Sequence, residues 1–157
     1  MIEIERKFLT LSDAFKTEAK SSYRIKQGFL NRNPERTVRI RLKGEQGFLT
    51  VKGKSSDDGL SRYEWEKELS KADAEALLLL CEEGVINKTR YEVPYGKHTF
   101  EVDEFFGDNN GLIIAEIELQ QESEWFNKPD WLGEEVTGQI QYYNAQLSKQ
   151  PFNTWEK

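Results

Sequence analysis

The chain has 157 residues, a formal net charge of −6 and a charged fraction of 32%. This length is enough for one domain with a hydrophobic core of its own, and we expect a single domain over residues 1–157. The acidic balance argues against a broad surface for nucleic acid or anionic membrane, so we expect neither as a partner.

Alternating polar and apolar residues predict a β-rich chain with few helices. Strands are predicted at residues 2–10, 22–31, 36–43, 46–54, 61–69, 87–95, 98–106 and 112–121. Helices are predicted within 11–20, from Ser70 to about residue 83 before Gly84, and from Thr137 to about Lys149. Residues typical of turns separate several of the strands, which indicates that most neighbours are joined by hairpins.

The predicted strands carry pairs of strongly ionised residues on one face. Successive side chains of a strand point to opposite faces, so residues two apart share a face. These sets are Glu3, Glu5 and Lys7; Arg39, Arg41 and Lys43; Lys52 and Lys54; Arg62, Glu64, Glu66 and Glu68; Lys88 and Arg90; Glu101 and Asp103; and Glu116 and Glu118. An ordinary half-buried strand also has a polar face, but paired charges on nearly every strand are unusual.

The opening segment shows what chemistry such pairs can support. Glu3 and Glu5 offer two adjacent carboxylates, which suit a hard divalent cation, and Lys7 beside them suits a phosphate bound to that cation. An exposed strand with mixed charges would show the same pattern. This segment alone therefore leaves both interpretations open.

Short strands joined by hairpins favour a closed barrel, because closure removes the exposed edges of an open sheet. The predicted fold class is α+β and β-rich, an eight-stranded antiparallel β-barrel with a few covering helices. With the charged faces inward, the barrel becomes a tunnel with a charged lumen and an apolar outer shell. Burying these charges without compensation would be prohibitive, so mutual pairing, water and a ligand must stabilise them.

The ordered set of charged motifs resembles the CYTH family of triphosphate tunnel metalloenzymes. The resemblance rests on Glu3-x-Glu5-x-Lys7, Arg39-x-Arg41, Lys52, Glu64-x-Glu66, Lys88-x-Arg90, Asp103 and Glu116-x-Glu118, with Gln27-Gly28-Phe29-Leu30 and Glu135-Val136-Thr137. It implies an eight-stranded tunnel that binds Mg²⁺ or Mn²⁺ and a triphosphate, and that cleaves or rearranges the triphosphate. A short chain with little outside the tunnel is most similar to the bacterial inorganic tripolyphosphatases.

Residue roles follow from this resemblance and from charge. The predicted metal ligands are Glu3, Glu5, Glu64, Glu66, Asp103, Glu116 and Glu118. The predicted phosphate-binding residues are Lys7, Arg39, Arg41, Lys52, Arg62, Lys88 and Arg90, because phosphoryl transfer depends mainly on positioning and charge neutralisation. The predicted catalytic residues are Lys52, Lys88 and Glu5, with either lysine as general acid on the leaving phosphate.

Structural ion pairs are the main alternative for Arg62, Glu66 and Asp103, and Glu64 is a further candidate partner of the arginines. Solvated charges at strand ends are expected for Lys43, Lys54, Glu68 and Glu101.

The C-terminal segment departs from the family pattern. Members often read Glu-Val-Thr-Gly-Asp-x-Arg-Tyr before an asparagine, whereas this chain has Gln139 and Gln141 in place of the acid and the base. The change bears on substrate preference and on closure of the tunnel mouth. Tyr142, Tyr143 and Asn144 either cap the opening or serve only as packing residues.

The expected function is metal-dependent hydrolysis of the terminal phosphate of a triphosphate, with inorganic tripolyphosphate as substrate. No adenine pocket is evident, because most aromatic residues fall on the apolar strand faces. One alternative is a class IV adenylyl cyclase that makes cyclic AMP from ATP. Another is a non-catalytic module that binds polyphosphate or a phosphorylated ligand, although a pure anion binder gains little from paired carboxylates.

The chain shows no sign of export. No apolar run is long enough to span a bilayer, and the charged start of the sequence is unlike a signal peptide. Cys81 is the single cysteine, which excludes an internal disulfide and suits a reducing compartment. We therefore predict a cytoplasmic protein that is a monomer or a homodimer.

Overall fold

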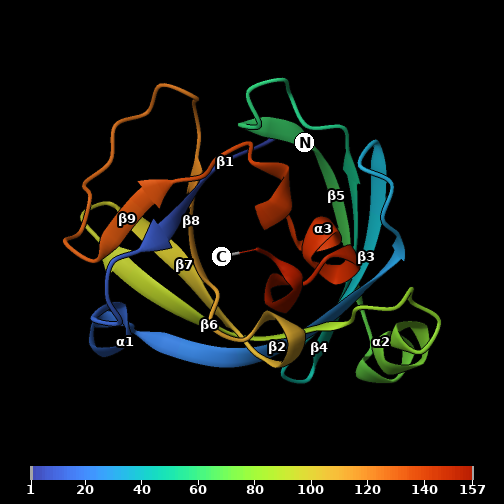
Figure 1. Ribbon diagram of the computed structural model, residues 1–157. Coiled ribbons are helices and arrows are strands. Elements are labelled where there is room, and N and C mark those ends of the chain that lie inside the picture. Colours follow the sequence, from blue (N-terminus) through green and yellow to red (C-terminus); the bar gives the residue numbers. More distant parts are fainter. Residues whose placement is uncertain (1, 157) are drawn as a thin grey trace.

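The computed structural model describes residues 2–156, so Met1 and Lys157, the ends of the predicted domain, lie outside the described residues. Within this range the sheet contains β1 (Ile2–Thr10), β2 (Ser21–Asn31), β3 (Arg36–Lys43), β4 (Gln46–Gly53), β5 (Ser61–Leu69), β6 (Ile86–Tyr95), β7 (His98–Phe105), β8 (Ile113–Leu119) and β9 (Leu132–Glu135). The strand order is β5-β4-β3-β2-β6-β7-β8-β1-β9, with a further pairing of β5 with β1. Eight antiparallel strands therefore close into a barrel, as predicted, with β9 added to β1 (Figure 1).

The seam of the barrel lies along β1. The first residues of β1 pair with β5, where Ile2 lies opposite Tyr63 and Glu3 opposite Arg62. The last residues of β1 pair instead with β9, where Phe8 lies opposite Glu135. The strand β9 was not predicted, because its sequence Leu-Gly-Glu-Glu lacks the alternation of a half-buried strand.

The helix α1 (Phe15–Glu18) lies within the predicted range 11–20, whereas α2 (Lys71–Leu78) and α3 (Asn144–Lys149) are both shorter than predicted. The 3₁₀ turns are at Gly107–Asn109, Ile140–Tyr142 and Phe152–Thr154. The hydroxyl of Ser70 accepts a hydrogen bond from the Asp73 N–H, which confirms the predicted cap of α2. This helix ends before residue 83 because the Glu82 N–H donates to the Phe29 carbonyl at 2.8 Å, which joins the following segment to β2.

The last helix is the largest correction. It begins at Asn144 and not at Thr137, because the preceding residues are bound to β1. The Val136 N–H donates to the Lys7 carbonyl at 2.8 Å. The Lys7 N–H donates in turn to the Thr137 hydroxyl at 2.9 Å.

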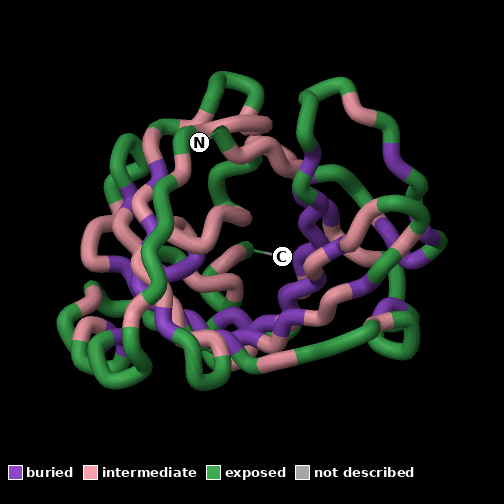
Figure 2. Tube along the Cα trace, turned by 180° about the vertical axis from the view of Figure 1, so that it is seen from behind, coloured by how far each residue is buried: buried purple, intermediate pink, exposed green. Residues whose placement is uncertain are grey.

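Apolar side chains cover the outside of the barrel, as the strand pattern predicts. One cluster joins β1, β6, β7 and β8 to α1 and the 120–132 segment, and it includes Phe8, Phe15, Phe100, Phe126 and Trp131. A second cluster packs α2 on β3 and β4 through Ile40, Ala74 and Leu78. Figure 2 shows the buried residues concentrated in the strands and the exposed ones in the connecting loops. In the described part of the chain, no helix has the length and apolar character needed to cross a membrane.

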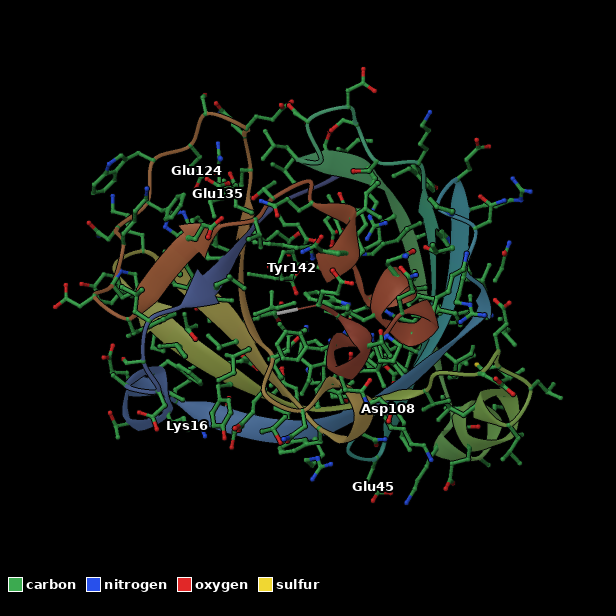
Figure 3. All side chains as sticks on the ribbon, viewed as in Figure 1. Lys16, Glu45, Asp108, Glu124, Glu135 and Tyr142 are labelled. Atoms are coloured by element: carbon green, nitrogen blue, oxygen red, sulfur yellow. The ribbon has the colours of Figure 1, made fainter. Side chains whose placement is uncertain are left out.

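The C-terminal segment lies inside the ring of strands (Figure 1). Its Leu147 joins a buried apolar cluster with Ile86, Phe105, Leu112 and Ile114. The ring of Tyr142 lies within the barrel in Figure 3 and packs edge-on against Trp155, with 5.3 Å between ring centroids, whereas Lys16 and Glu45 lie at the periphery. Part of the lumen is therefore filled by an apolar plug, and the charged residues occupy the rest.

Candidate active site

A pocket of about 460 Å³ lies in the charged part of the lumen. It brings together most of the predicted site residues, namely Glu3, Glu5, Lys7, Arg39, Arg41, Lys52, Arg62, Glu64, Glu66, Arg90, Glu116 and Glu118. The other two, Lys88 and Asp103, do not line this pocket but are buried in contact with its wall. The alternation of the strands thus places the predicted site residues in one region.

Strand register determines which charges meet. In an antiparallel ladder, directly opposed residues project to the same face. Lys7 lies opposite Glu116 across β1 and β8, and its Nζ donates to Glu116 at 2.6 Å and to Glu5 at 3.2 Å. Lys52 lies opposite Glu64 across β4 and β5, and its Nζ donates to Glu3 at 2.8 Å. Two lysines therefore hold the carboxylates of three strands.

We call the pocket carboxylates of Glu3, Glu5, Glu64, Glu116 and Glu118 the acidic wall. One of them, Glu118, lacks such a partner. Burial raises the pKa of Glu5, but the ammonium groups of Lys7 and Lys52 outweigh it and hold that pKa at about 2. Burial also raises the pKa of Glu118, and the carboxylates of Glu3, Glu64 and Glu5 raise it further. No side chain of residues 2–156 forms a hydrogen bond or an ion pair with Glu118. Glu118 is exposed, and its carboxylate is therefore available to a cation.

The donor chemistry of this wall fits a hard divalent cation. Carboxylate oxygens are the ligands that Mg²⁺ and Mn²⁺ prefer. Among the described residues, however, no three acidic, histidine or cysteine side chains are already arranged around a common metal position. Lysine ammonium groups contact several of the candidate ligands, so a bound metal would have to replace some of these contacts.

Arg39 and Arg41 on β3 and Arg90 on β6 also line the pocket, and we call them the basic wall. The Arg41 Nε donates to Gln27 Oε1 at 3.3 Å, and no carboxylate of the described chain forms an ion pair with Arg41. Burial lowers the Arg41 pKa to about 9, with contributions from the positive charges of Arg39 and Arg90. Burial, together with Arg90, also lowers the pKa of Arg39. Such crowding of cations favours an anionic ligand.

Lys88 and Asp103 form a buried pair behind Arg90. The Lys88 Nζ lies 2.8 Å from an Asp103 carboxylate oxygen and donates to Asn144 Oδ1 at 3.2 Å. Burial lowers the Lys88 pKa to about 7; Asp103 opposes this shift, and the positive charges of Arg90 and Arg41 add to it. Arg90 donates to both oxygens of Asp103, at 2.8 and 2.9 Å. These contacts match the alternative role predicted for Asp103, as a partner of basic residues.

The pocket also contains residues that were not predicted as site residues. Lys54 and Glu101 line it, although they were expected to be solvated charges at strand ends. Thr50 lines it as well, and its hydroxyl accepts from Arg39 and donates to Glu66 at 2.7 Å. The alternation could have identified Thr50, because it lies two residues before Lys52 and shares its face.

Tyr143 completes the pocket from the C-terminal segment. Its ring centroid lies 5.6 Å from the Lys7 Nζ and 5.5 Å from the Arg62 guanidinium carbon. Its hydroxyl lies 3.4 Å from the Ser55 hydroxyl, in the loop between β4 and β5. This loop meets the C-terminal segment at Gly59 and Gly138, which both have positive φ, and a Cβ at Gly59 would collide with the Gly138 backbone.

Comparison with known proteins agrees with this geometry. The CYTH domain model matches residues 1–150. An inorganic triphosphatase from Acetivibrio thermocellus is 45% identical over 156 residues, which cover 99% of this chain and 98% of that protein. An inorganic triphosphatase from Nitrosomonas europaea is 36% identical over 154 residues, which cover 94% and 97% of the two chains. A solved structure of an inorganic triphosphatase superposes with a TM-score of 0.66 at 31% identity, covering 93% of this chain and 97% of the other. The chain therefore belongs to the CYTH domain family.

Proposed function

We propose that this protein is a metal-dependent triphosphatase that hydrolyses the terminal phosphate of inorganic tripolyphosphate inside the barrel. The observation that carries the proposal is the environment of Arg41, a half-buried guanidinium that lies near two other arginines and forms no ion pair with a carboxylate of the described residues. A bound polyanion would supply the missing negative charge. The names of the two curated relatives, both inorganic triphosphatases, support the same substrate class.

The phosphate chain would bind along the basic side of the pocket. Lys7, Arg39, Arg41, Lys52, Arg62 and Arg90 line that pocket and are the proposed contacts to phosphate oxygens. Lys88 is fully buried behind Arg90 and does not line the pocket, so we assign it to holding Asp103 and Asn144 and not to contact with the substrate. Arginines offer planar donor pairs to phosphate, whereas lysines act as compact charges.

The acidic side would hold the metal, for which we propose Mg²⁺ or Mn²⁺. Glu3, Glu5, Glu64, Glu116 and Glu118 are the proposed ligands, and Glu5 is the one we place closest to the reaction. Glu66 also lines the pocket and is a further proposed ligand, whereas Asp103 lies outside the pocket and is engaged by Arg90 and Lys88. A bound divalent ion would neutralise phosphate charge and help to orient the chain.

In the proposed reaction, a water oxygen forms a bond to the terminal phosphorus. The bond from that phosphorus to the bridging oxygen breaks, and the products are orthophosphate and pyrophosphate. Lys52, which lines the pocket, would donate a proton to the leaving pyrophosphate oxygen, and the attacking water would release its proton to solvent. Lys88 is the other predicted general acid, but it is fully buried and does not line the pocket, and Asp103 and Asn144 hold its ammonium group.

The test is to incubate the purified protein with tripolyphosphate or ATP, in the presence of Mg²⁺, Mn²⁺ or EDTA. Released phosphate, pyrophosphate and cyclic AMP are measured. We expect metal-dependent phosphate release from tripolyphosphate, lost in Glu5→Gln and retained in Glu68→Gln, a variant outside the pocket on β5. Cyclic AMP with pyrophosphate from ATP would identify a cyclase instead, and metal-dependent binding without turnover would identify a binding module.

A further inference from the structure

Gln27 lies on the inward face of β2, next to the basic wall. It stands directly opposite Arg41 across the β2–β3 ladder and opposite Ile86 across the β2–β6 ladder. Its side chain is fully buried, with 0% of the residue exposed. Its Oε1 accepts a hydrogen bond from the Arg41 Nε at 3.3 Å, whereas its Nε2 finds no acceptor among the described residues.

Arg41 and Arg90 differ in the charge of their partners, because Gln27 is neutral and Asp103 is negatively charged. Asp103 takes the Nε and one terminal nitrogen of Arg90, and it also neutralises the charge of that guanidinium. Gln27 takes only the Nε of Arg41 and adds no charge. An arginine held in this way keeps its terminal nitrogens and its full positive charge for another partner.

Stability alone does not explain a glutamine at this position. A buried amide donor without an acceptor is unfavourable, because its hydrogen bonds to water are lost and none replaces them. Gln27 lies against Ile86, where an apolar side chain of similar size would avoid this cost. The amide makes a contact with Arg41 that an apolar side chain could not make.

We infer that Gln27 is a positioning residue that fixes the Arg41 guanidinium, so that its terminal nitrogens face the phosphate chain with their charge unneutralised. The inference rests on the proposed function, because it assigns the phosphates to Arg41. A glutamate at this position would also accept from the Nε, but it would supply the counter-charge that Arg41 lacks. Two substitutions of Gln27 can therefore separate the effect of fixing the Arg41 guanidinium from the effect of neutralising its charge.

The experiment compares Gln27→Met, which removes the acceptor, with Gln27→Glu, which keeps an acceptor and adds a charge. We expect Gln27→Met to raise KM for tripolyphosphate about tenfold with a smaller change in kcat, because Arg41 loses its fixed orientation. Gln27→Glu should raise KM further, since it competes with phosphate for Arg41. The thermal midpoint of Gln27→Met should equal or exceed that of the wild type.

A double-mutant cycle with Arg41→Ala separates positioning from a general structural effect. If Gln27 acts through Arg41, Gln27→Met should cause little further loss of tripolyphosphate binding, measured by calorimetry, in the Arg41→Ala background. Additive losses in the two backgrounds would overturn the inference. So would a wild-type KM in Gln27→Met, or a lowered midpoint with unchanged KM. Gln27→Leu repeats the test should Gln27→Met not fold.

The two proposals fail in different ways. A wild-type protein that neither binds nor hydrolyses tripolyphosphate would overturn the proposed function and, with it, this inference. A wild-type protein that does both, beside a Gln27→Met variant with unchanged binding and KM, would overturn only the role of Gln27.

Discussion

Glu5 on β1 and Glu118 on β8 stand directly opposite each other across an antiparallel ladder, and both line the pocket. Like charges in this position repel and destabilise the sheet. Burial raises the pKa of Glu118, and the carboxylates of Glu3, Glu64 and Glu5 raise it further. The arrangement costs the ligand-free protein some stability, and a bound cation would relieve this repulsion.

The change in protein stability on adding metal tests whether a cation binds near Glu5 and Glu118. In EDTA, Glu118→Gln should be more stable than the wild type by about 0.2–1 kcal/mol, because one of two opposed charges is removed. Added Mg²⁺ or Mn²⁺ should raise the thermal midpoint of the wild type and raise that of Glu118→Gln much less. Glu68→Gln is the matched control and should respond to metal like the wild type. An equal metal response in all three proteins would place the cation elsewhere.

In the basic wall too, we expect a residue that binds the substrate to lower the stability of the ligand-free protein. Arg41→Met removes a half-buried charge that forms no ion pair with the described residues, so we expect the ligand-free variant to be at least as stable as the wild type in denaturant. Tripolyphosphate at 100 times its Kd should stabilise the wild type by about 2.7 kcal/mol and should stabilise the variant far less. Arg36→Met, at an exposed arginine paired only with its neighbour Glu35, is the control. A variant that is less stable without ligand and equally stabilised by it would contradict the proposed role of Arg41.

The alternation of residues predicts most of the barrel and most of the pocket, because both follow from a period of two. The strand boundaries agree with the prediction to within two residues, and the charges predicted to face inward do so around the pocket. Register is not predictable in this way, since pairing between distant strands depends on the whole barrel. The meeting of Glu5 with Glu118, and of Lys7 with Glu116, is therefore known only from the structure.

The C-terminal part of the chain resists prediction for a different reason. Thr137 to Lys149 has the composition of a helix, but Val136 and Thr137 hydrogen-bond to Lys7 in β1. These tertiary contacts override local propensity. They also bring Tyr143 and Asn144 to the pocket, two residues that the sequence predicts either to cap the opening or to serve only in packing.

The lowered pKa of Asp103 should make the free energy of unfolding depend on pH. Burial raises its pKa, but Arg90 and Lys88 outweigh burial and lower the pKa from 3.8 to about 2. A carboxyl whose pKa is depressed by folding stabilises the protein above its unfolded pKa and loses this effect as pH falls through its folded pKa. Asp103→Asn should cost about 3–5 kcal/mol at pH 7, because two buried bases lose their counter-ion.

The difference in unfolding free energy between the wild type and Asp103→Asn should then narrow as pH falls from about 4 to about 2, where the wild-type carboxyl becomes protonated. Urea unfolding of both proteins across this range measures the difference. Asp108→Asn, at a residue on the 3₁₀ turn after β7, controls for the general effect of losing a carboxylate. A difference that stays constant down to pH 2 would show that Asp103 is not stabilised in its charged form.

We expect the ring of Tyr143 to make the pocket select tripolyphosphate over ATP. Its ring lies beside Lys7 and Arg62, two proposed phosphate-binding residues, and the contact of Gly59 with Gly138 holds the segments around it together. If the phosphate chain binds at Lys7 and Arg62 as proposed, the ring would occupy space beside it into which a nucleoside would extend. Tyr143→Ala should therefore raise kcat/KM for ATP relative to tripolyphosphate, by about tenfold.

Tyr143→Phe separates the ring from the hydroxyl, because it keeps the ring and removes only the contact with Ser55. We expect this variant to discriminate against ATP like the wild type. Initial rates with both substrates, at matched metal concentration, decide the question. If Tyr143→Ala instead lowered ATP turnover while leaving tripolyphosphate turnover unchanged, the ring would be a platform on which adenine stacks, and the preference for inorganic triphosphate would have to come from another part of the pocket.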